Sequence, residues 1–204
     1  MLNKKKALRK IIKVRVSAIS ADERRKREEI LHNNLFSMPE FLSASSVMLF
    51  ANLPDEIDTF SLIDKCFAMG KKVFLPVING DEMTVAEFTG EYKIGRFGIK
   101  EPVTELGVEG SVTEPVDVRN SVPELVDVLL TDREKGPEHF DFVLVPGVAF
   151  SPNGYRLGRG KGYYDKFLSK YSNLFTVGVC FREQFFLDIP TEPHDVPMQR
   201  VLVI

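Results

Sequence analysis

The sequence lacks the short motifs of several common enzyme and metal-site classes. It contains no Gly-x-Ser-x-Gly elbow, no His-x-x-x-His pair and no Cys-x-x-Cys motif, so hydrolase triads and structural zinc sites have no support. The histidines are His32, His139 and His194, and none has a nucleophile beside it, although His194 precedes Asp195. The sequence therefore favours a chemistry that needs no nucleophile from the protein.

The chain is also poor in cysteine, in net charge and in long apolar runs. A formal net charge of -2 gives no general attraction to nucleic acid or to anionic membranes, so neither is expected as a partner. Cys66 and Cys180 lie in apolar surroundings and are predicted to be buried and reduced. No run is long enough to cross a bilayer, and the basic segment 4–6 is unlike a secretory signal, so we expect a cytoplasmic protein.

Apolar runs and helical periodicities predict an α/β fold. We expect a three-layer α/β/α sandwich with a mostly parallel sheet, in a single domain that spans residues 1–204. The predicted strands are 46–51, 73–77, 83–88, 142–145, 176–181 and 200–204. The predicted helices are 4–19, a helix opened by a capping box of Ser20 and Glu23, a helix capped by Thr59 that ends at Gly70, and helices at 160–171 and 182–187.

One stretch does not fit this pattern of strands and helices. Residues 103–138 are rich in valine, glutamate and proline, and segment 111–118 is repeated approximately at 121–128. Two copies are too few for a solenoid. The acidic, proline-containing composition predicts a surface insertion without a catalytic role.

The most informative segment is residues 156–165, which we call the glycine-rich loop. Its three glycines let the backbone approach a ligand closely, and its two arginines and one lysine carry charge that suits phosphate oxygens. A helix that starts near Gly160 would place Asp165 on the same face as Lys161, four residues earlier. The segment therefore predicts a polyphosphate cradle with Mg²⁺ between protein and nucleotide. It has neither the Walker nor the dinucleotide spacing, and the alternative is a flexible basic loop capped by a helix.

A second candidate segment is the acidic stretch 55–59, which follows the first predicted strand. Open parallel sheets bind ligands at the carboxyl ends of their strands, so this stretch is expected on the same rim as the glycine-rich loop. A carboxylate there would recognise a ring that carries amino and amide donors. The alternative is a solvated loop with a threonine cap.

Residues 146–165 resemble the signature of the 5-formyltetrahydrofolate cyclo-ligases, also called 5,10-methenyltetrahydrofolate synthetases. Segment 5–9 resembles the ATP-contacting N-terminal helix of this family, segment 55–59 its folate-contacting loop, and His194-Asp195 a metal-site pair. The resemblance covers most of 4–100 and 141–200 and leaves the repeat-bearing insertion unmatched. Gln199 departs from it, since many relatives carry an acidic residue there. The family's fold is similar to those of ribose-phosphate isomerases and CoA transferases.

The resemblance implies an ATP- and Mg²⁺-dependent conversion of 5-formyltetrahydrofolate to 5,10-methenyltetrahydrofolate, with release of ADP and phosphate through a phosphorylated formyl (imino-phosphate) intermediate. The implied partners are reduced folate and ATP as small-molecule substrates, in a monomer or weak homodimer. The implied site residues are catalytic Arg159, Lys161 and Tyr163; substrate-binding Ala51, Glu56 and Tyr163; metal-binding Asp165 and Asp195; and ATP-binding Lys5, Lys6, Ala7, Leu8, Arg9, Arg156, Leu157, Gly158, Arg159, Gly160, Lys161, Gly162, Tyr163 and Tyr164.

Two other functions stay open at the level of sequence. A regulator that binds nucleotide or folate without turnover would keep the same loop, and a sugar-phosphate isomerase of similar fold would use phosphate as part of its substrate. The dependence on ATP separates the three, because the regulator would bind ATP without consuming it and the isomerase would ignore it.

Overall fold

The computed structural model of the chain describes residues 2–94, 100–104, 141–171 and 174–204. Their main sheet has seven strands in the order β4-β3-β2-β1-β5-β8-β9. Strands β2, β1, β5, β8 and β9 are parallel, and β3 and β4 add antiparallel to one edge. The strands are β1 Ser46–Met48, β2 Lys72–Asn79, β3 Glu82–Ile94, β4 Lys100–Thr104, β5 Phe142–Val145, β8 Thr176–Cys180 and β9 Arg200–Val203.

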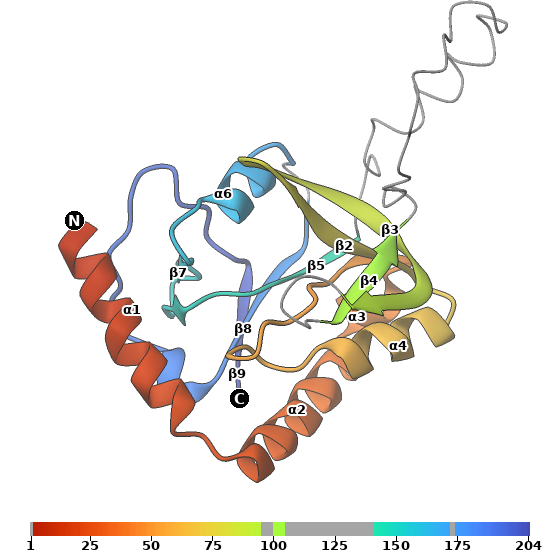
Figure 1. The fold of residues 1–204 in the computed structure, drawn as a ribbon, viewed down its shortest axis with the longest axis horizontal. Helices are drawn as coiled ribbons and strands as arrows, with labels where there is room; N and C mark the ends of the chain where they lie inside the picture. Colours follow the sequence, from red (N-terminus) through yellow and green to blue (C-terminus); the bar gives the residue numbers. More distant parts are fainter. Residues whose placement is uncertain (1, 95–99, 105–140, 172–173) are drawn as a thin grey trace, which may run out of the picture.

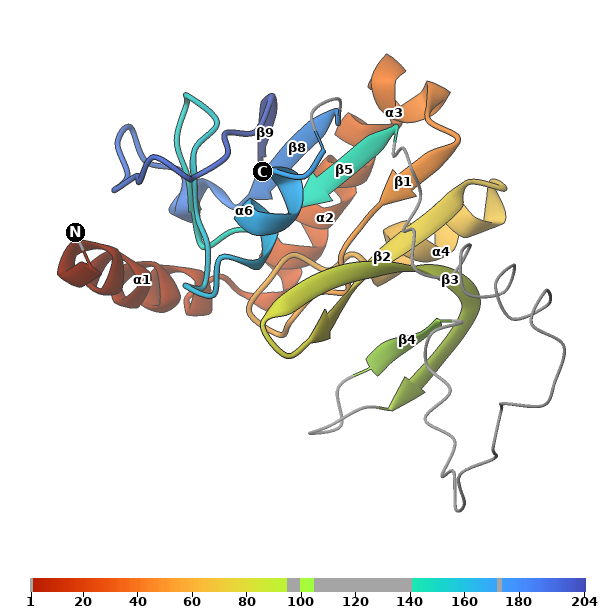
Figure 2. The ribbon, with the colours of Figure 1, turned by 90° about the horizontal axis from the view of Figure 1, so that it is seen from above.

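Helices cover both faces of this sheet. Figure 1 shows α6 above the strands and α2 and α4 below them, with α1 at the end that carries the N-terminus. Figure 2 shows the strands twisting from β9 to the hairpin of β2 and β3. The predicted α/β/α arrangement with a mostly parallel sheet is confirmed. The helices are α1 Leu2–Ser17, α2 Ala21–Phe36, α3 Pro39–Ser43, α4 Phe60–Ala68 and α6 Tyr163–Leu168, with a 3₁₀ turn at Arg182–Gln184.

The central strands are buried on both faces, which explains their continuous apolar sequences. Phe142 and Leu144 of β5 belong to the apolar cluster that contains residues of α2 and α4, whereas Val143 and Val145 belong to the cluster that contains residues of α6. Side chains of a strand alternate between faces, so each strand supplies both clusters. All four of these side chains are fully buried.

The helix predicted at 160–171 is shorter than expected. It begins at Tyr163 and ends at Leu168, because Gly160 and Gly162 have φ angles of 105° and 68°, in the left-handed region that a helix does not contain. Lys161 therefore precedes the helix, and the prediction that it shares a helical face with Asp165 is wrong.

Other differences concern segments of weak periodicity. The helix predicted at 182–187 is only a 3₁₀ turn of three residues, and the sequence did not predict α3, β4 or the two-stranded sheet of β6 Ala149–Phe150 and β7 Arg156–Leu157. On α1, Ile12 is buried and Ile11 is half exposed. Residues 103 and 104 of the predicted insertion end β4, and the rest of it lies outside the described residues.

The helix caps lie at the predicted residues, but only one of the two predicted side chains makes a capping hydrogen bond. Ser20 caps α2, and its hydroxyl accepts a hydrogen bond from the Glu23 amide at 3.2 Å. Thr59 occupies the cap position of α4, but its hydroxyl donates to the carbonyl of Phe50. The first amide of α4 instead donates to the carboxylate of Asp58 at 2.9 Å. Thr59 thus ties the loop after β1 to the strand end, and Asp58 caps the helix.

The two cysteines are free and buried, as predicted. Burial raises the pKa of the Cys66 thiol, and likewise that of Cys180, to about 12, so both are protonated near neutral pH. Within the described part of the chain, no helix combines the length and apolar character that crossing a membrane requires.

Replacing Gly178 with alanine is expected to destabilise the fold by about 1–3 kcal/mol, the usual cost of overpacking a core. Gly178 lies on β8, and a Cβ atom there would overlap the ring of Phe150, which is fully buried. Chemical denaturation measures the effect. A double-mutant cycle with Phe150→Leu should show strong non-additivity, because the smaller side chain removes the overlap. Additive effects would exclude this steric cause.

Candidate functional site

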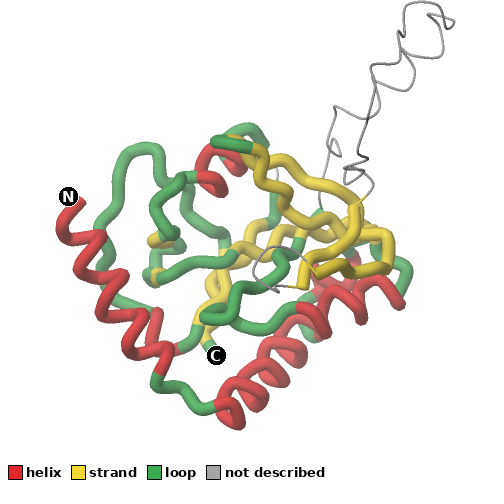
Figure 3. The backbone as a smooth tube through the Cα atoms, viewed as in Figure 1, coloured by secondary structure: helices red, strands yellow, loops and turns green. Residues whose placement is uncertain are grey.

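A cavity of about 1050 Å³ lies at the carboxyl ends of the parallel strands. Figure 3 shows loops between α1 and the strands, and several of these loops supply residues of the cavity lining. This position is where open α/β sheets commonly bind ligands. The lining comes from α1, the loop after β1, the β2–β3 hairpin, the glycine-rich loop with α6, and segment 192–197.

Most of the predicted site residues meet at this cavity. The exceptions are Lys6 and Ala7, which are exposed on α1, and Leu8, which packs against the apolar core. Their contact with a nucleotide stays a prediction. The predicted residues that line the cavity are Lys5, Arg9, Ala51, Glu56, Arg156, Leu157, Gly158, Arg159, Gly160, Lys161, Gly162, Tyr163, Tyr164, Asp165 and Asp195.

The structure adds an apolar wall that sequence reasoning missed. Pro76, Ile78 and Met83 of the β2–β3 hairpin line the cavity, together with Phe50. The hydroxyl of Tyr163 donates to the carbonyl of Gly80 at 3.0 Å and so ties the hairpin turn to the glycine-rich loop. Nothing in the hairpin sequence distinguishes it from an ordinary surface hairpin, because only the tertiary contact brings it to the cavity.

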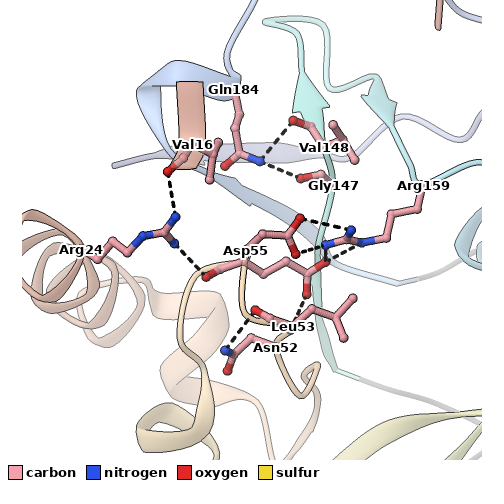
Figure 4. A network of polar contacts seen from close by, with 10 residues as sticks. Val16, Arg24, Asn52, Leu53, Asp55, Gly147, Val148, Arg159 and Gln184 are labelled. Atoms are coloured by element: carbon pink, nitrogen blue, oxygen red, sulfur yellow. Dashed lines mark hydrogen bonds and ion pairs between the residues drawn. The ribbon is translucent and has the colours of Figure 1, made fainter. Parts of the chain in front are cut away.

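Arg159 joins the glycine-rich loop to the acidic stretch after β1. Its guanidinium donates four hydrogen bonds, two to Asp55 at 2.6 and 3.3 Å and two to Glu56 at 2.9 and 3.2 Å. Figure 4 shows Arg159 pointing at Asp55 across the gap between the two loops. The expectation that both segments lie on one rim is confirmed.

Arg24 of α2 holds the acidic stretch after β1 against α1. Arg24 donates to the backbone carbonyl of Glu56 at 3.4 Å and to that of Val16 in α1 at 2.8 Å, so it connects three elements (Figure 4). Burial raises the pKa of Asp55, but the hydrogen bond and positive charge of Arg159, a backbone hydrogen bond and the charge of Lys13 together outweigh this effect and leave the pKa lowered. Asp55 is therefore ionised near neutral pH, as its ion pair requires.

Helix α1 positions the backbone of the glycine-rich loop. Arg9 donates from Nε to the carbonyl of Gly158 at 2.8 Å, and its guanidinium also packs beside Gly160. The two glycines with positive φ, Gly160 and Gly162, let the loop turn sharply before α6 begins. The N-terminal helix is thus part of the site through its contact with the loop.

Arg156 is a buried cation, a burial that the sequence did not predict, and its contact with ATP stays a prediction. It lies on β7 with only 4% of its side chain exposed, pairs with Asp165 at 2.9 Å, and packs against the ring of Tyr164. Asp165 also accepts a hydrogen bond from the amide of Val196 at 3.4 Å. Burial raises the pKa of the Tyr164 hydroxyl. Arg156 therefore holds Asp165 at the cavity wall.

Lys5 connects α1 to segment 192–197. Its ammonium group donates to Glu192 at 2.8 Å and to Asp195 at 3.3 Å. Burial lowers the pKa of Lys5, but the hydrogen bonds and negative charges of these two carboxylates together outweigh it and raise the pKa overall. Oxygen and nitrogen atoms of Glu192, His194 and Asp195 lie within 4.8 Å of one another, a grouping that suits a metal ion. Neither Glu192 nor the clustering with Lys5 was predicted.

Gly154 fixes segment 192–197 in place. Its φ is 81°, its carbonyl accepts from the amide of Met198 at 2.9 Å, and a Cβ atom here would overlap the carbonyl of Met198. Gln199 does not line the cavity; its side-chain oxygen accepts from the amide of Thr176 at 3.2 Å at the start of β8. Its side-chain oxygen accepts this hydrogen bond as a carboxylate oxygen would. Because Gln199 does not line the cavity, its departure from the family pattern does not change the cavity wall.

The remaining histidines differ in their placement. His194 lines the cavity, whereas His32 contacts Ser61 and Lys65 on the surface of α2 and α4. Burial lowers the pKa of His32. His139 lies outside the described residues. Of the histidines in the described ranges, only His194 is therefore close enough to the cavity to take part in its chemistry.

Asp165 and Asp195 suit Mg²⁺ in their chemistry. Both are carboxylates at the cavity wall, each held by a neighbouring cation and a backbone amide. Mg²⁺ prefers oxygen ligands and is commonly held by one or two carboxylates together with substrate phosphates. The residues present therefore fit this ion.

Comparison with known proteins places the chain in a family. Residues 1–119 and 129–204 match the model of the 5-formyltetrahydrofolate cyclo-ligase family. Only 120–128 is left unmatched, so the expectation that the whole insertion lacks a counterpart is wrong. The chain is 28% identical to the 5-formyltetrahydrofolate cyclo-ligase of Mus musculus, over 97% of this chain and 92% of the relative, and 30% identical to a probable one of Caenorhabditis elegans, over 97% and 91%.

Solved structures agree with this match. The 5,10-methenyltetrahydrofolate synthetase of Aquifex aeolicus has a TM-score of 0.72 and 33% identity, and the match covers 98% of this chain and 89% of that one. The corresponding protein of Mycoplasma pneumoniae has a TM-score of 0.67 at 19% identity, over 97% and 96%, which supports the fold alone. Because the family model spans most of the sequence, the chain belongs to the 5-formyltetrahydrofolate cyclo-ligase family of enzymes.

Proposed function

We propose that the protein converts 5-formyltetrahydrofolate to 5,10-methenyltetrahydrofolate and consumes ATP, with release of ADP and phosphate. One observation carries the proposal: a single cavity of about 1050 Å³ is lined by the cationic glycine-rich loop, the carboxylate of Glu56 and an apolar wall. That volume is at the upper end of the usual range for ligand pockets, which suits two substrates bound side by side. Membership of the family supports the same reaction.

The proposed reaction begins with the formyl oxygen as the nucleophile. This oxygen attacks the γ-phosphorus of ATP, and the bond to the bridging oxygen breaks as ADP leaves. The neighbouring folate nitrogen then attacks the activated formyl carbon and gives up its proton to solvent, and the carbon–oxygen bond breaks as phosphate departs. Each bond that forms is balanced by one that breaks, and the protein supplies no nucleophile. This agrees with the lack of a triad in the sequence.

The side chains then have to align the two substrates and offset negative charge. Lys161 and Arg159 would face the phosphoryl group, where preorganised cations stabilise the charge that spreads over its oxygens. Glu56 would accept hydrogen bonds from the amino and amide donors of the pterin, with Ala51 beside it. Tyr163 would lie next to the formyl group, because its ring lines the cavity between the loop and the hairpin. Positioning of this kind is a large part of phosphoryl-transfer catalysis.

We propose Mg²⁺ as the cofactor, held by Asp165 and Asp195. When bound with ATP it would neutralise part of the charge of the phosphates. Arg156 orients Asp165, and the amide of Glu192 donates to Asp195 at 2.7 Å, so both carboxylates are fixed by the protein.

We also propose a cytoplasmic location and a monomeric or weakly dimeric state. The first is supported by two buried, free thiols, which are typical of a reducing compartment. The second is a prediction for size-exclusion chromatography with light scattering, and a tight oligomer would contradict it.

The test of the proposed function is an absorbance assay. Purified protein is mixed with 5-formyltetrahydrofolate and Mg²⁺, with and without ATP, and the near-ultraviolet band of the methenyl product is followed. We expect the band to grow only when ATP is present. Binding of ATP without product would support the regulator, and indifference to both ligands would support an isomerase.

A further inference from the structure

The guanidinium of Arg159 is almost fully occupied by two carboxylates. It has five N–H groups, and its four hydrogen bonds to Asp55 and Glu56 involve all three of its nitrogens. Phosphate recognition by Arg159 would need the same N–H groups, because arginine binds phosphate through paired donors. In this geometry, Arg159 therefore has to release carboxylates before it can bind a phosphate in this way.

The local charge works in the same direction. One guanidinium faces two carboxylates, so these three side chains together carry a net charge of -1 beside a cavity that is proposed to bind a polyphosphate, and the cations that could offset it are Lys5, Arg9 and Lys161 of the cavity lining. Asp55 does not line that cavity, whereas Glu56 and Arg159 do. Glu56 is thus shared: it faces the cavity, where the folate is proposed to bind, and it also holds Arg159.

We propose that Asp55 and Glu56 restrain Arg159, and that reduced folate, by taking the Glu56 carboxylate, releases Arg159 for the phosphates of ATP. Asp55 is then a positioning residue that sets the affinity of the nucleotide site without touching either substrate. The two substrates bind with positive coupling, and by linkage each strengthens the other equally. The inference rests on the proposed function, which assigns folate to Glu56 and ATP to Arg159.

The decisive variant is Asp55→Asn, because a gain of affinity is predicted for it. Removing one of the two restraining charges should tighten binding of the non-hydrolysable ATP analogue AMP-PNP, with Mg²⁺ and without folate, by about threefold to fivefold, the upper part of the range for exposed ion pairs. Isothermal titration calorimetry on the full chain measures it. Loss of loop structure would weaken binding, so a merely structural role for Asp55 predicts the opposite sign.

A matched control is Asp58→Asn, which removes the same charge from the same loop. Asp58 makes no hydrogen bond to Arg159 among those of the described residues, and asparagine keeps its role as the cap of α4. AMP-PNP affinity should change by less than about twofold in this control. Unchanged or weaker binding in Asp55→Asn, with a normal thermal melting curve, overturns the proposal.

A second variant tests the coupling itself. In the wild-type protein, saturating 5-formyltetrahydrofolate should tighten AMP-PNP binding about threefold to tenfold, whereas in Arg159→Met the folate effect should disappear. A folate effect that persists in Arg159→Met overturns the proposal, since direct contact between the ligands would then carry the coupling. If the wild-type protein binds neither ligand, the proposed function fails as well. If it turns over substrate normally but Asp55→Asn shows no gain, only the restraint is excluded.

Discussion

Replacing Lys161 with alanine is expected to lower turnover by about a hundredfold to a thousandfold while the fold stays intact. The side chain is exposed at the cavity, and it precedes α6 in a turn made by two glycines, so its removal disturbs no packing. Its proposed role is to stabilise negative charge on the phosphoryl group in the transition state, and loss of one such preorganised group typically costs this much. The ATP-dependent absorbance assay at saturating substrates measures the loss.

The control for this prediction is Lys170→Ala. Lys170 follows α6, is also exposed, and does not line the cavity, so the same loss of charge at a nearby position should leave turnover within about twofold. Circular dichroism and thermal melting should be unchanged for both variants. Near-normal turnover of Lys161→Ala would exclude the glycine-rich loop as the phosphate site.

Replacing Asp195 with asparagine is expected to raise the Mg²⁺ concentration needed for half-maximal turnover by about tenfold to a hundredfold, as disturbances of metal sites commonly do. Asparagine keeps the shape of the side chain, and its amide oxygen can still accept from the Glu192 amide, as the carboxylate now does at 2.7 Å. The side chain loses its charge and hence its attraction for the ion. Calorimetric titration of Mg²⁺ in the presence of AMP-PNP gives a readout that does not depend on turnover.

Two further variants decide which carboxylates hold the metal. Asp165→Asn should raise the Mg²⁺ requirement as Asp195→Asn does, and Glu192→Gln should change it little, although Glu192 binds the same ammonium group of Lys5 at 2.8 Å. If Glu192→Gln instead raises the Mg²⁺ requirement the most, the ion lies at Glu192, His194 and Asp195. That result would refute the assignment of the ion to Asp165 and Asp195.

The glycine-rich loop shows how far local sequence can be used to predict a site. Its glycines, cations and carboxylate predicted a ligand-binding loop after a core strand, and residues 156–165 do line the cavity. The predicted start of its helix was wrong, since Gly162 delays the helix to Tyr163. The burial of Arg156 on β7 was not predicted. Neither feature can be read from periodicity, because periodicity counts residues, whereas φ angles and burial depend on contacts with segments that are distant in the sequence.

The helices and strands with strong periodicity were predicted well, and the weak ones were not. β5 is apolar throughout because both of its faces are covered, so its four residues identify it without further information. The 3₁₀ turn at Arg182–Gln184 and the short strand β7 have no such signal. Segments this short are set by tertiary hydrogen bonds, for example those of Gln184 to the carbonyls of Gly147 and Val148 at 3.1 Å, which Figure 4 shows.

The sequence by itself determined the α/β class, the layering of the sheet and the family, because burial patterns and a long contiguous motif are local properties of the chain. Only the tertiary structure decided which charges face one another. Lys5 pairs with Asp195, and Arg159 is held by Asp55 and Glu56, across sequence separations of 190, 104 and 103 residues. Electrostatic interactions depend on distance in space and on burial, and neither quantity is contained in the order of the residues.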